Sequence, residues 1–199
     1  MSDSIQNLTD DQRVEQLAAH YKAILELLGE DPAREGLVKT PVRAAKAMLA
    51  LTSGYRKSPE EIIKSALFKE EYGSRGQIVV VKDIEFYSFC EHHILPFFGK
   101  AHIGYVPDGC VTGLSKLARL VDAFARRLQL QERLTSEICE SLQTALHAQG
   151  VIVVIESRHL CMQMRGVEKQ GAITTTSSYT GVFEDLSRRE EFFALIGRR

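Results

Sequence analysis

The sequence predicts an α+β fold in which a helical N-terminal region precedes an antiparallel sheet. Before about residue 70, apolar side chains recur only at helical spacing. From Gly76 onward, β-branched runs and helical patterns follow one another in the order ββααββ, with a short helix at the end. A chain of 199 residues fits one domain with an extension. We therefore expect a helical region over residues 1–70, and over residues 71–199 a four-stranded antiparallel sheet with two helices on one face.

Three helices are expected in the N-terminal region, and each follows a capping signal. Thr9 and Gln12 fit a capping box before an amphipathic stretch that Gly29 ends. Thr40-Pro41 marks a second start, with threonine as the cap and proline at the first helical position. Ser58, followed by Pro-Glu-Glu, marks a third start.

After Gly76 the elements alternate between strand and helix patterns. Residues 77–84 are rich in β-branched side chains, and residues 97–106 should pair with them as a hairpin-like unit. Helical periodicity then predicts helices over 114–128 and 132–148, and strands are expected over 151–156 and 174–179. Ser187 with Glu190 marks the start of a final helix that Gly197 ends.

Composition limits the classes of function that are compatible with the chain. Lys plus Arg number 25 and Asp plus Glu number 26, so charge gives no general attraction to nucleic acid. Residues 1–10 lack the apolar core of a signal peptide, and the longest aliphatic run, residues 151–155, is too short to span a bilayer. We therefore expect a cytoplasmic protein with no membrane or nucleic-acid partner. There, four cysteines indicate metal binding or burial rather than disulfides.

Two short segments combine cysteine and histidine and predict a metal site. Cys90 and His93 are three residues apart, so one helical turn would direct both side chains to one point. His159 and Cys161 are two residues apart, which on a strand places them on one face. Thiolate and imidazole are zinc ligands, and catalytic zinc sites use three protein ligands. Cys161 is the natural third ligand, which leaves His92 and His159 beside the metal. A closed Cys2His2 site that includes His159 is the structural alternative, and it would indicate a binding module.

Cationic and polar side chains elsewhere suggest a site for an anionic ligand. Ser115 and Lys116 begin a helix whose unpaired backbone amides would attract phosphate. Further cations at suitable spacing are Arg119, Arg165, Arg43 and Lys46. Each of these alone is more often part of a solvated face. Gln131-Glu132 is either a loop with an acid at a helix start or a pair that reads the edge of a base.

Several separate motifs, in order, resemble the GTP cyclohydrolase I family along nearly the whole chain after about residue 10. The matching runs are residues 27–32, 40–43, 90–93, 113–117, 131–135, 159–161 and 164–166. The resemblance implies a tunnelling (T-fold) domain and a homodecamer with active sites at subunit interfaces. It also implies zinc-dependent hydrolysis of GTP to 7,8-dihydroneopterin triphosphate and formate, the first step toward tetrahydrofolate.

The resemblance also assigns roles to residues by position. Cys90, His93 and Cys161 would hold zinc, and His92 and His159 would transfer protons. Gln131 and Glu132 would hold guanine, and the ribose and triphosphate would meet Ser115, Lys116, Arg119 and Arg165, with Arg43 and Lys46 reaching in from a neighbouring subunit. Zinc would activate a water for attack on guanine C8, and ribose ring opening and rearrangement would follow. Which histidine serves which proton transfer stays open.

Two other classes of function share parts of this pattern. Another T-fold enzyme, such as the NADPH-dependent nitrile reductase of queuosine biosynthesis, uses a cysteine nucleophile and no zinc triad. The pairing of Cys90 and His93 with Cys161 favours the cyclohydrolase. A zinc module that binds nucleic acid is disfavoured by the near-neutral charge and by the lack of clustered aromatic and basic residues.

Overall fold

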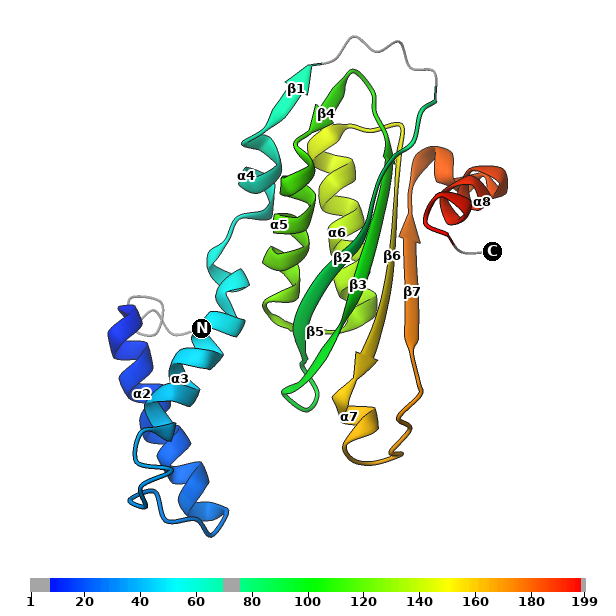
Figure 1. Ribbon diagram of the computed structural model, residues 1–199. Coiled ribbons are helices and arrows are strands. Elements are labelled where there is room, and N and C mark those ends of the chain that lie inside the picture. The colour runs from blue at the N-terminus through cyan, green and yellow to red at the C-terminus, as the bar shows by residue number, and fades with distance from the viewer. Residues whose placement is uncertain (1–7, 70–75, 198–199) are drawn as a thin grey trace. The chain divides into compact units, whose positions relative to one another are not determined.

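The computed structural model describes residues 8–69 and 76–197 (Figure 1). The chain divides into two compact units, residues 1–52 and residues 53–199. The sequence predicts that residues 1–10 do not form a signal peptide. Residues 1–7 of this stretch lie outside the described residues. No helix in the described ranges combines the length and the apolar character that a membrane crossing requires.

The first unit consists of two helices that pack against each other, α2 (Asp10–Leu27) and α3 (Thr40–Leu51). The predicted capping box is confirmed: the Gln12 amide donates to Thr9 Oγ1 at 3.3 Å, and the Thr9 amide donates to Gln12 Oε1 at 2.8 Å. The second predicted cap is wrong. Lys39 is the capping residue and Thr40 is the first residue of α3; the Thr40 hydroxyl donates to the Gly36 carbonyl at 3.3 Å and does not cap the helix.

The second unit begins with short elements that lead into its sheets. A 3-10 helix, η1 (Ser53–Arg56), is followed by α4 (Pro59–Lys64), whose start at Ser58 is confirmed by a bond from the Glu61 amide to Ser58 Oγ. The next strand, β1 (Leu67–Lys69), pairs with β4 (Cys110–Thr112) in a small antiparallel sheet. The sequence pattern was too short to predict this two-stranded sheet.

The main sheet has five strands in the order β5-β2-β3-β6-β7, so the prediction of four strands is corrected. The long strands are β2 (Val79–Cys90), β3 (Leu95–Val106), β6 (Gly150–His159) and β7 (Thr174–Tyr179). These pair antiparallel, as predicted. The fifth strand, β5 (Leu128–Gln129), is only two residues long and pairs parallel with the end of β2. Two residues cannot show a strand periodicity, which is why the sequence did not reveal it.

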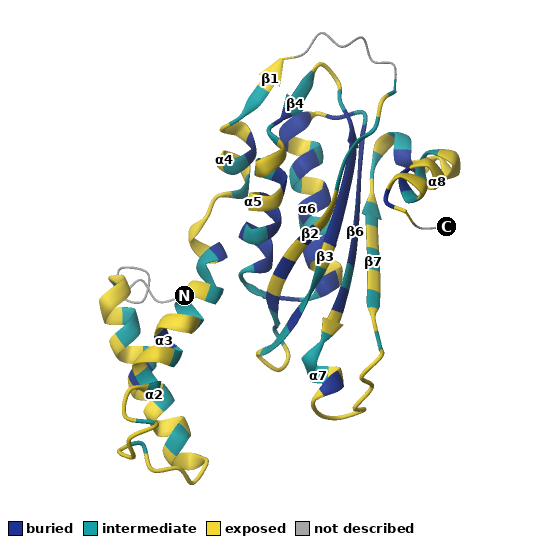
Figure 2. Ribbon diagram, in the orientation of Figure 1, coloured by how far each residue is buried: buried dark blue, intermediate teal, exposed yellow. Residues whose placement is uncertain are grey.

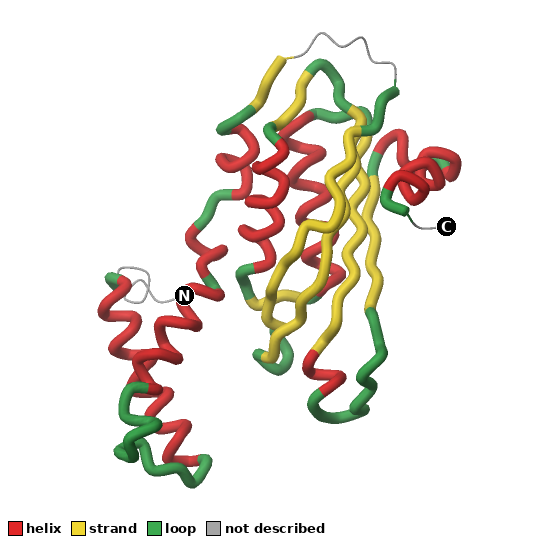
Figure 3. The backbone as a smooth tube through the Cα atoms, viewed as in Figure 1, coloured by secondary structure: helices red, strands yellow, loops and turns green. Residues whose placement is uncertain are grey.

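Two helices cover one face of this sheet, as predicted: α5 (Leu114–Ala125) and α6 (Gln131–Leu146) (Figures 1 and 3). The main core lies between them and the strands, where the ribbon is darkest in Figure 2. It contains the fully buried side chains of Phe97, Ile103, Leu117, Leu134, Ile138 and Leu142. Burial of this apolar area is the main source of the stability of the unit.

The opposite face of the sheet packs against the C-terminal segment. A 3-10 helix, η2 (Gly181–Glu184), leads into α8 (Leu186–Leu195), and Phe183 and Phe192 pack with Ile152 and Val154 in a second apolar cluster. The predicted cap at Ser187 is wrong. Asp185 caps α8 because its carboxylate accepts from the Ser187 amide at 2.9 Å.

The register of the sheet determines which segments meet at its lower end in Figure 1. The predicted pairing of β2 with β3 is present, but β2 continues six residues past its predicted end at residue 84, so the hairpin turns only at residues 91–94 and Cys90 lies at the end of the strand. β6 pairs with β3 so that His159 lies opposite Phe97, next to this turn. After His159 the chain forms the short helix α7 (Leu160–Gln163). Two segments about 70 residues apart in the sequence therefore lie side by side.

Candidate active site

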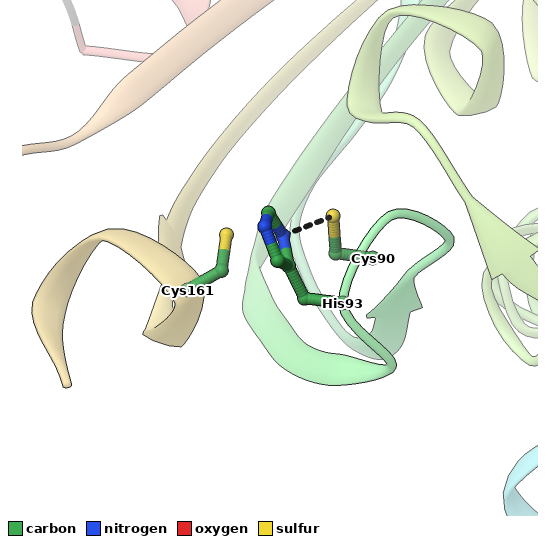
Figure 4. A group of neighbouring side chains, drawn as sticks. All are labelled: Cys90, His93 and Cys161. Atoms are coloured by element: carbon green, nitrogen blue, oxygen red, sulfur yellow. Dashed lines mark hydrogen bonds between the residues drawn. The ribbon is translucent and has the colours of Figure 1, made fainter. Parts of the chain in front are cut away.

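The turn between β2 and β3 holds the first two candidate ligands. Cys90 is the last residue of β2, and its carbonyl accepts from the Ile94 amide at 2.8 Å and from the His93 amide at 3.3 Å. These bonds close one turn that directs the His93 ring back toward Cys90. Cys90 Sγ and His93 Nδ1 lie 4.0 Å apart (Figure 4). Cys90 and His93 therefore approach each other across one turn, as the sequence predicts.

The sequence predicts that Cys161 lies on a strand. In the structure it lies on a helix beside the turn. β6 ends at His159, and Cys161 lies in the first turn of α7. The alternation of a strand therefore does not place His159 and Cys161 on one face. Cys161 instead points toward His93 and Cys90 (Figure 4). The ligand atoms of Cys90, His93 and Cys161 all lie within 4.8 Å of one another, and no other group of this kind occurs in the described ranges.

This donor set fits a tetrahedral metal ion with one position left for a fourth group. With metal–sulfur bonds of about 2.3 Å and metal–nitrogen bonds of about 2.0–2.1 Å, tetrahedral ligand atoms lie roughly 3.6–3.8 Å apart. The observed separations need to close by only about 1 Å at most. His159 is not in the group, and its Nε2 lies 2.8 Å from Gln131 Oε1. The geometry therefore favours an open three-ligand site over the closed Cys2His2 alternative.

A pocket of about 230 Å³ lies beside the three candidate ligands. His92, His159 and Glu132 also line it, as do Met162 and Thr174. Glu132 is in the first turn of α6, where the helix dipole favours a carboxylate, and it is exposed. The His92 and His93 rings are perpendicular, with their centroids 6.2 Å apart, so the two imidazoles differ in direction. The pocket thus combines a metal-binding group with two further imidazoles and an acid.

His159 is held from two sides. Its ring stacks on Phe97, with the centroids 4.6 Å apart and the planes 2° from parallel. On the other side Gln131, which is only 1% exposed, directs its Oε1 at Nε2 of the ring. Ser157 Oγ donates to the same oxygen at 2.6 Å. The orientation of this imidazole is therefore fixed by the protein before any ligand binds.

Burial affects the titration of two groups in the pocket. Removal from water lowers the pKa of His159, and the nearby Glu132 carboxylate opposes this shift. Burial, followed by the charge of neighbouring Cys90, raises the pKa of the Cys161 thiol, whereas Arg165 acts in the opposite direction. Two thiolates this close repel each other unless a cation lies between them, which is consistent with a metal-binding role.

Comparisons with known proteins identify the family. The family described as GTP cyclohydrolase I matches residues 17–197 of the chain. A protein named GTP cyclohydrolase 1 from Porphyromonas gingivalis is 63% identical over 183 residues, which cover 92% of this chain and 93% of that protein.

The chain belongs to the GTP cyclohydrolase I family.

A second relative supports this assignment. GTP cyclohydrolase 1 from Bacteroides fragilis is 58% identical over 186 residues, 94% of each chain. The crystal structure of the apo archaeosine synthase QueF-Like superposes with a TM-score of 0.44 at 20% identity, covering 52% of this chain and 93% of that one, which is too distant to add to the argument. The predicted family, its T-fold and the prediction that the chain is an enzyme are confirmed.

Within this member of the GTP cyclohydrolase I family, the candidate phosphate ligands do not all lie beside the pocket. Ser115 and Lys116 are in the first turn of α5, next to β4. Gln129, which lines the pocket, belongs to β5, and β5 follows the other end of α5 (Figure 1). A helix of 12 residues is about 18 Å long. Within one chain, the length of α5 therefore lies between these two residues and the pocket.

The remaining cations are exposed. Arg119 lies on α5, and Arg165 follows α7, close enough to Cys161 for its charge to oppose the rise in the pKa of that thiol. Arg43 and Lys46 lie on α3 in the first unit.

The sequence reasoning missed three residues around His159. Ser157 is two residues earlier on β6, so strand alternation could have placed it on the same face as His159. Phe97 is opposite His159 in the register, which only the pairing of β3 with β6 reveals. Thr176 on β7 contacts Gln131, and no local pattern predicts that contact.

Proposed function

We propose that this protein hydrolyses GTP to 7,8-dihydroneopterin triphosphate and formate, with zinc as cofactor, as the first step toward tetrahydrofolate. One observation carries the proposal: a single pocket combines Cys90, His93 and Cys161 with two imidazoles and Glu132. Its family membership supports GTP as the substrate. The enzyme would act in the cytoplasm as a homo-oligomer, with a decamer as the expected assembly.

The proposed roles follow from the chemistry of each side chain. Cys90, His93 and Cys161 would hold the zinc ion, which when bound supplies Lewis-acid activation of water. Attack at C8 of guanine requires proton transfer to the purine. His92 and His159 line the same pocket and are the proposed proton carriers. Glu132 would accept hydrogen bonds from the donor edge of guanine, and a site built for those bonds rejects bases that leave the carboxylate unpaired.

The anionic end of the substrate requires cations, because the chain has a formal net charge of −1. Arg165 stands near the pocket. Ser115, Lys116 and Arg119 lie on α5, and the first two are at the end of the helix that is remote from the chain's own pocket. We propose that these residues, with Arg43 and Lys46, bind the ribose and triphosphate at a site shared between subunits. The separation along α5 supports this arrangement.

The test is a measurement of metal content and product on one sample. Zinc per chain is counted in the purified protein, which is then incubated with GTP while formate and the fluorescence of the oxidised pterin are followed. We expect both products to appear at the same rate. A zinc-loaded sample that releases no formate would exclude the proposed reaction.

A further inference from the structure

The Gln131 side chain has no free hydrogen-bonding position. Its Nε2 lies 3.1 Å from the Ile155 carbonyl, 3.0 Å from the Thr174 carbonyl and 3.1 Å from Thr176 Oγ1. Its Oε1 lies 2.6 Å from Ser157 Oγ and 2.8 Å from His159 Nε2. An amide has two donors and two acceptor lone pairs, so these partners satisfy both ends of the group.

The surroundings also fix which end of the amide is which. Ile155 and Thr174 offer carbonyl oxygens, which only accept hydrogen bonds, so the end facing them must be the NH2 group. The hydroxyls around it agree. Thr135 Oγ1 donates to the backbone carbonyl of Gln131 at 2.7 Å. Because its hydrogen is used there, Thr135 Oγ1 accepts from Thr176 Oγ1, 2.7 Å away. Thr176 Oγ1 can therefore accept a hydrogen bond from the side-chain NH2 group of Gln131. A reversed amide would place its oxygen against two carbonyls.

The fixed amide determines the state of the imidazole. Since Gln131 Oε1 can only accept, the nitrogen of His159 that faces it at 2.8 Å must carry a hydrogen. In the neutral ring that hydrogen leaves Nδ1 with the lone pair. We propose that Gln131 is a positioning residue, which holds the His159 ring in one orientation with a hydrogen on Nε2 and none on Nδ1, and that its side chain does not contact guanine. This inference rests on the proposed function for its catalytic consequence, and it revises the role that the family resemblance implied for Gln131.

The first test reads the imidazole directly and needs no substitution of Gln131. The protein is labelled with ¹⁵N in its histidine rings, loaded with zinc and studied by solid-state NMR at about pH 8, above the ordinary pKa of histidine. The resonances of His159 are those lost in the His159→Ala variant. We expect a protonated Nε2 and an unprotonated Nδ1. The opposite tautomer would overturn the inference, whether or not the protein acts on GTP.

The second test is a double-mutant cycle between Gln131→Leu and His159→Ala. A positioning residue acts through the histidine, so Gln131→Leu should lower kcat by about 100-fold in the wild-type background and by less than about threefold when His159 is already alanine. The dissociation constant of GTP should stay within about twofold, because the buried amide does not contact the ligand. A loss of GTP affinity that persists in the His159→Ala background would show a direct contact and overturn the inference.

A matched control lies on the same helix. Gln143 also has both ends of its amide bonded, to the Ala148 carbonyl and to Thr180 Oγ1, but it lies 12 residues further along α6, about 18 Å away. Gln143→Leu should leave kcat within about threefold of wild type and show no coupling to His159. If wild-type protein with zinc releases no formate, the proposed function fails, and the NMR test still decides the tautomer.

Discussion

At the scale of single residues, Cys161 is the candidate ligand that joins the two halves of the proposed metal site. It comes from α7, whereas Cys90 and His93 share one turn. Cys161→Ser should lose zinc and GTP turnover together, with activity falling by about 100-fold or more, since the metal contributes several kcal/mol to such reactions. Zinc analysis and formate release check this. Cys110→Ser, outside the group of three, is the control and should keep both.

His92 and His93 are neighbours with different expected roles. The ligand group contains His93, and His92 lines the pocket without joining that group. His92→Ala should therefore keep its zinc and lower kcat by about 10²–10⁴-fold, the usual contribution of a positioned acid or base. Stopped-assay kinetics and metal analysis on the same sample separate the two effects. Loss of zinc from this variant would mean that His92 is a ligand, and His20→Ala on α2 controls for the loss of an imidazole elsewhere.

At the scale of elements, the turn that holds the candidate ligands Cys90 and His93 contacts α6. The Glu91 carboxylate pairs with Arg133, whose Nε also donates to Gln129 Oε1 at 3.0 Å. The pair is partly exposed, so its contribution to overall stability should be below about 1 kcal/mol. It nevertheless links the turn to α6.

Arg133→Met should therefore weaken zinc binding by up to about tenfold while the unfolding midpoint hardly changes. Competition with a chelator and thermal unfolding measure the two quantities. Arg126→Met breaks a comparable ion pair with Asp122 that does not touch the turn, and its zinc affinity should match wild type. Equal weakening in both variants would contradict a role for the turn contact.

The sequence predicted those elements whose signal is local. The β-branched run at the start of β2 and the period of 3.6 in α5 and α6 are long enough to recognise, and the spacing of Cys90 and His93 indicates a metal site. The second half of β2 was not predicted as strand. β5 has two residues, and α7 has four, so neither shows a period. The helical position of Cys161 was missed for that reason. The contact of Gln131 with His159 joins positions 28 residues apart, and only the pairing of α6 with β6 creates it.

At the scale of the whole molecule, one chain does not assemble all the proposed substrate contacts. Lys116 lies in the first turn of α5, and the pocket lies past the other end of that helix. If a complete site takes Cys161 from one subunit and Lys116 from its neighbour, two inactive variants should complement each other. Cys161→Ser and Lys116→Ala, co-assembled in equal amounts, should recover about one quarter of wild-type activity, because random assembly gives an intact copy of each contribution with a probability of about one half.

Activity is measured as formate released per chain, before and after the two variants are unfolded together and refolded. A mixture of Cys161→Ser and His92→Ala is the matched control. Both residues line the pocket of one chain, so mixing cannot rebuild a complete site, and no activity should return. Recovery in the first mixture alone would place Lys116 and Cys161 on different subunits of one site. If the first mixture is no more active than its components, Lys116 and Cys161 do not act in one site from different subunits. That result would contradict the proposed shared site.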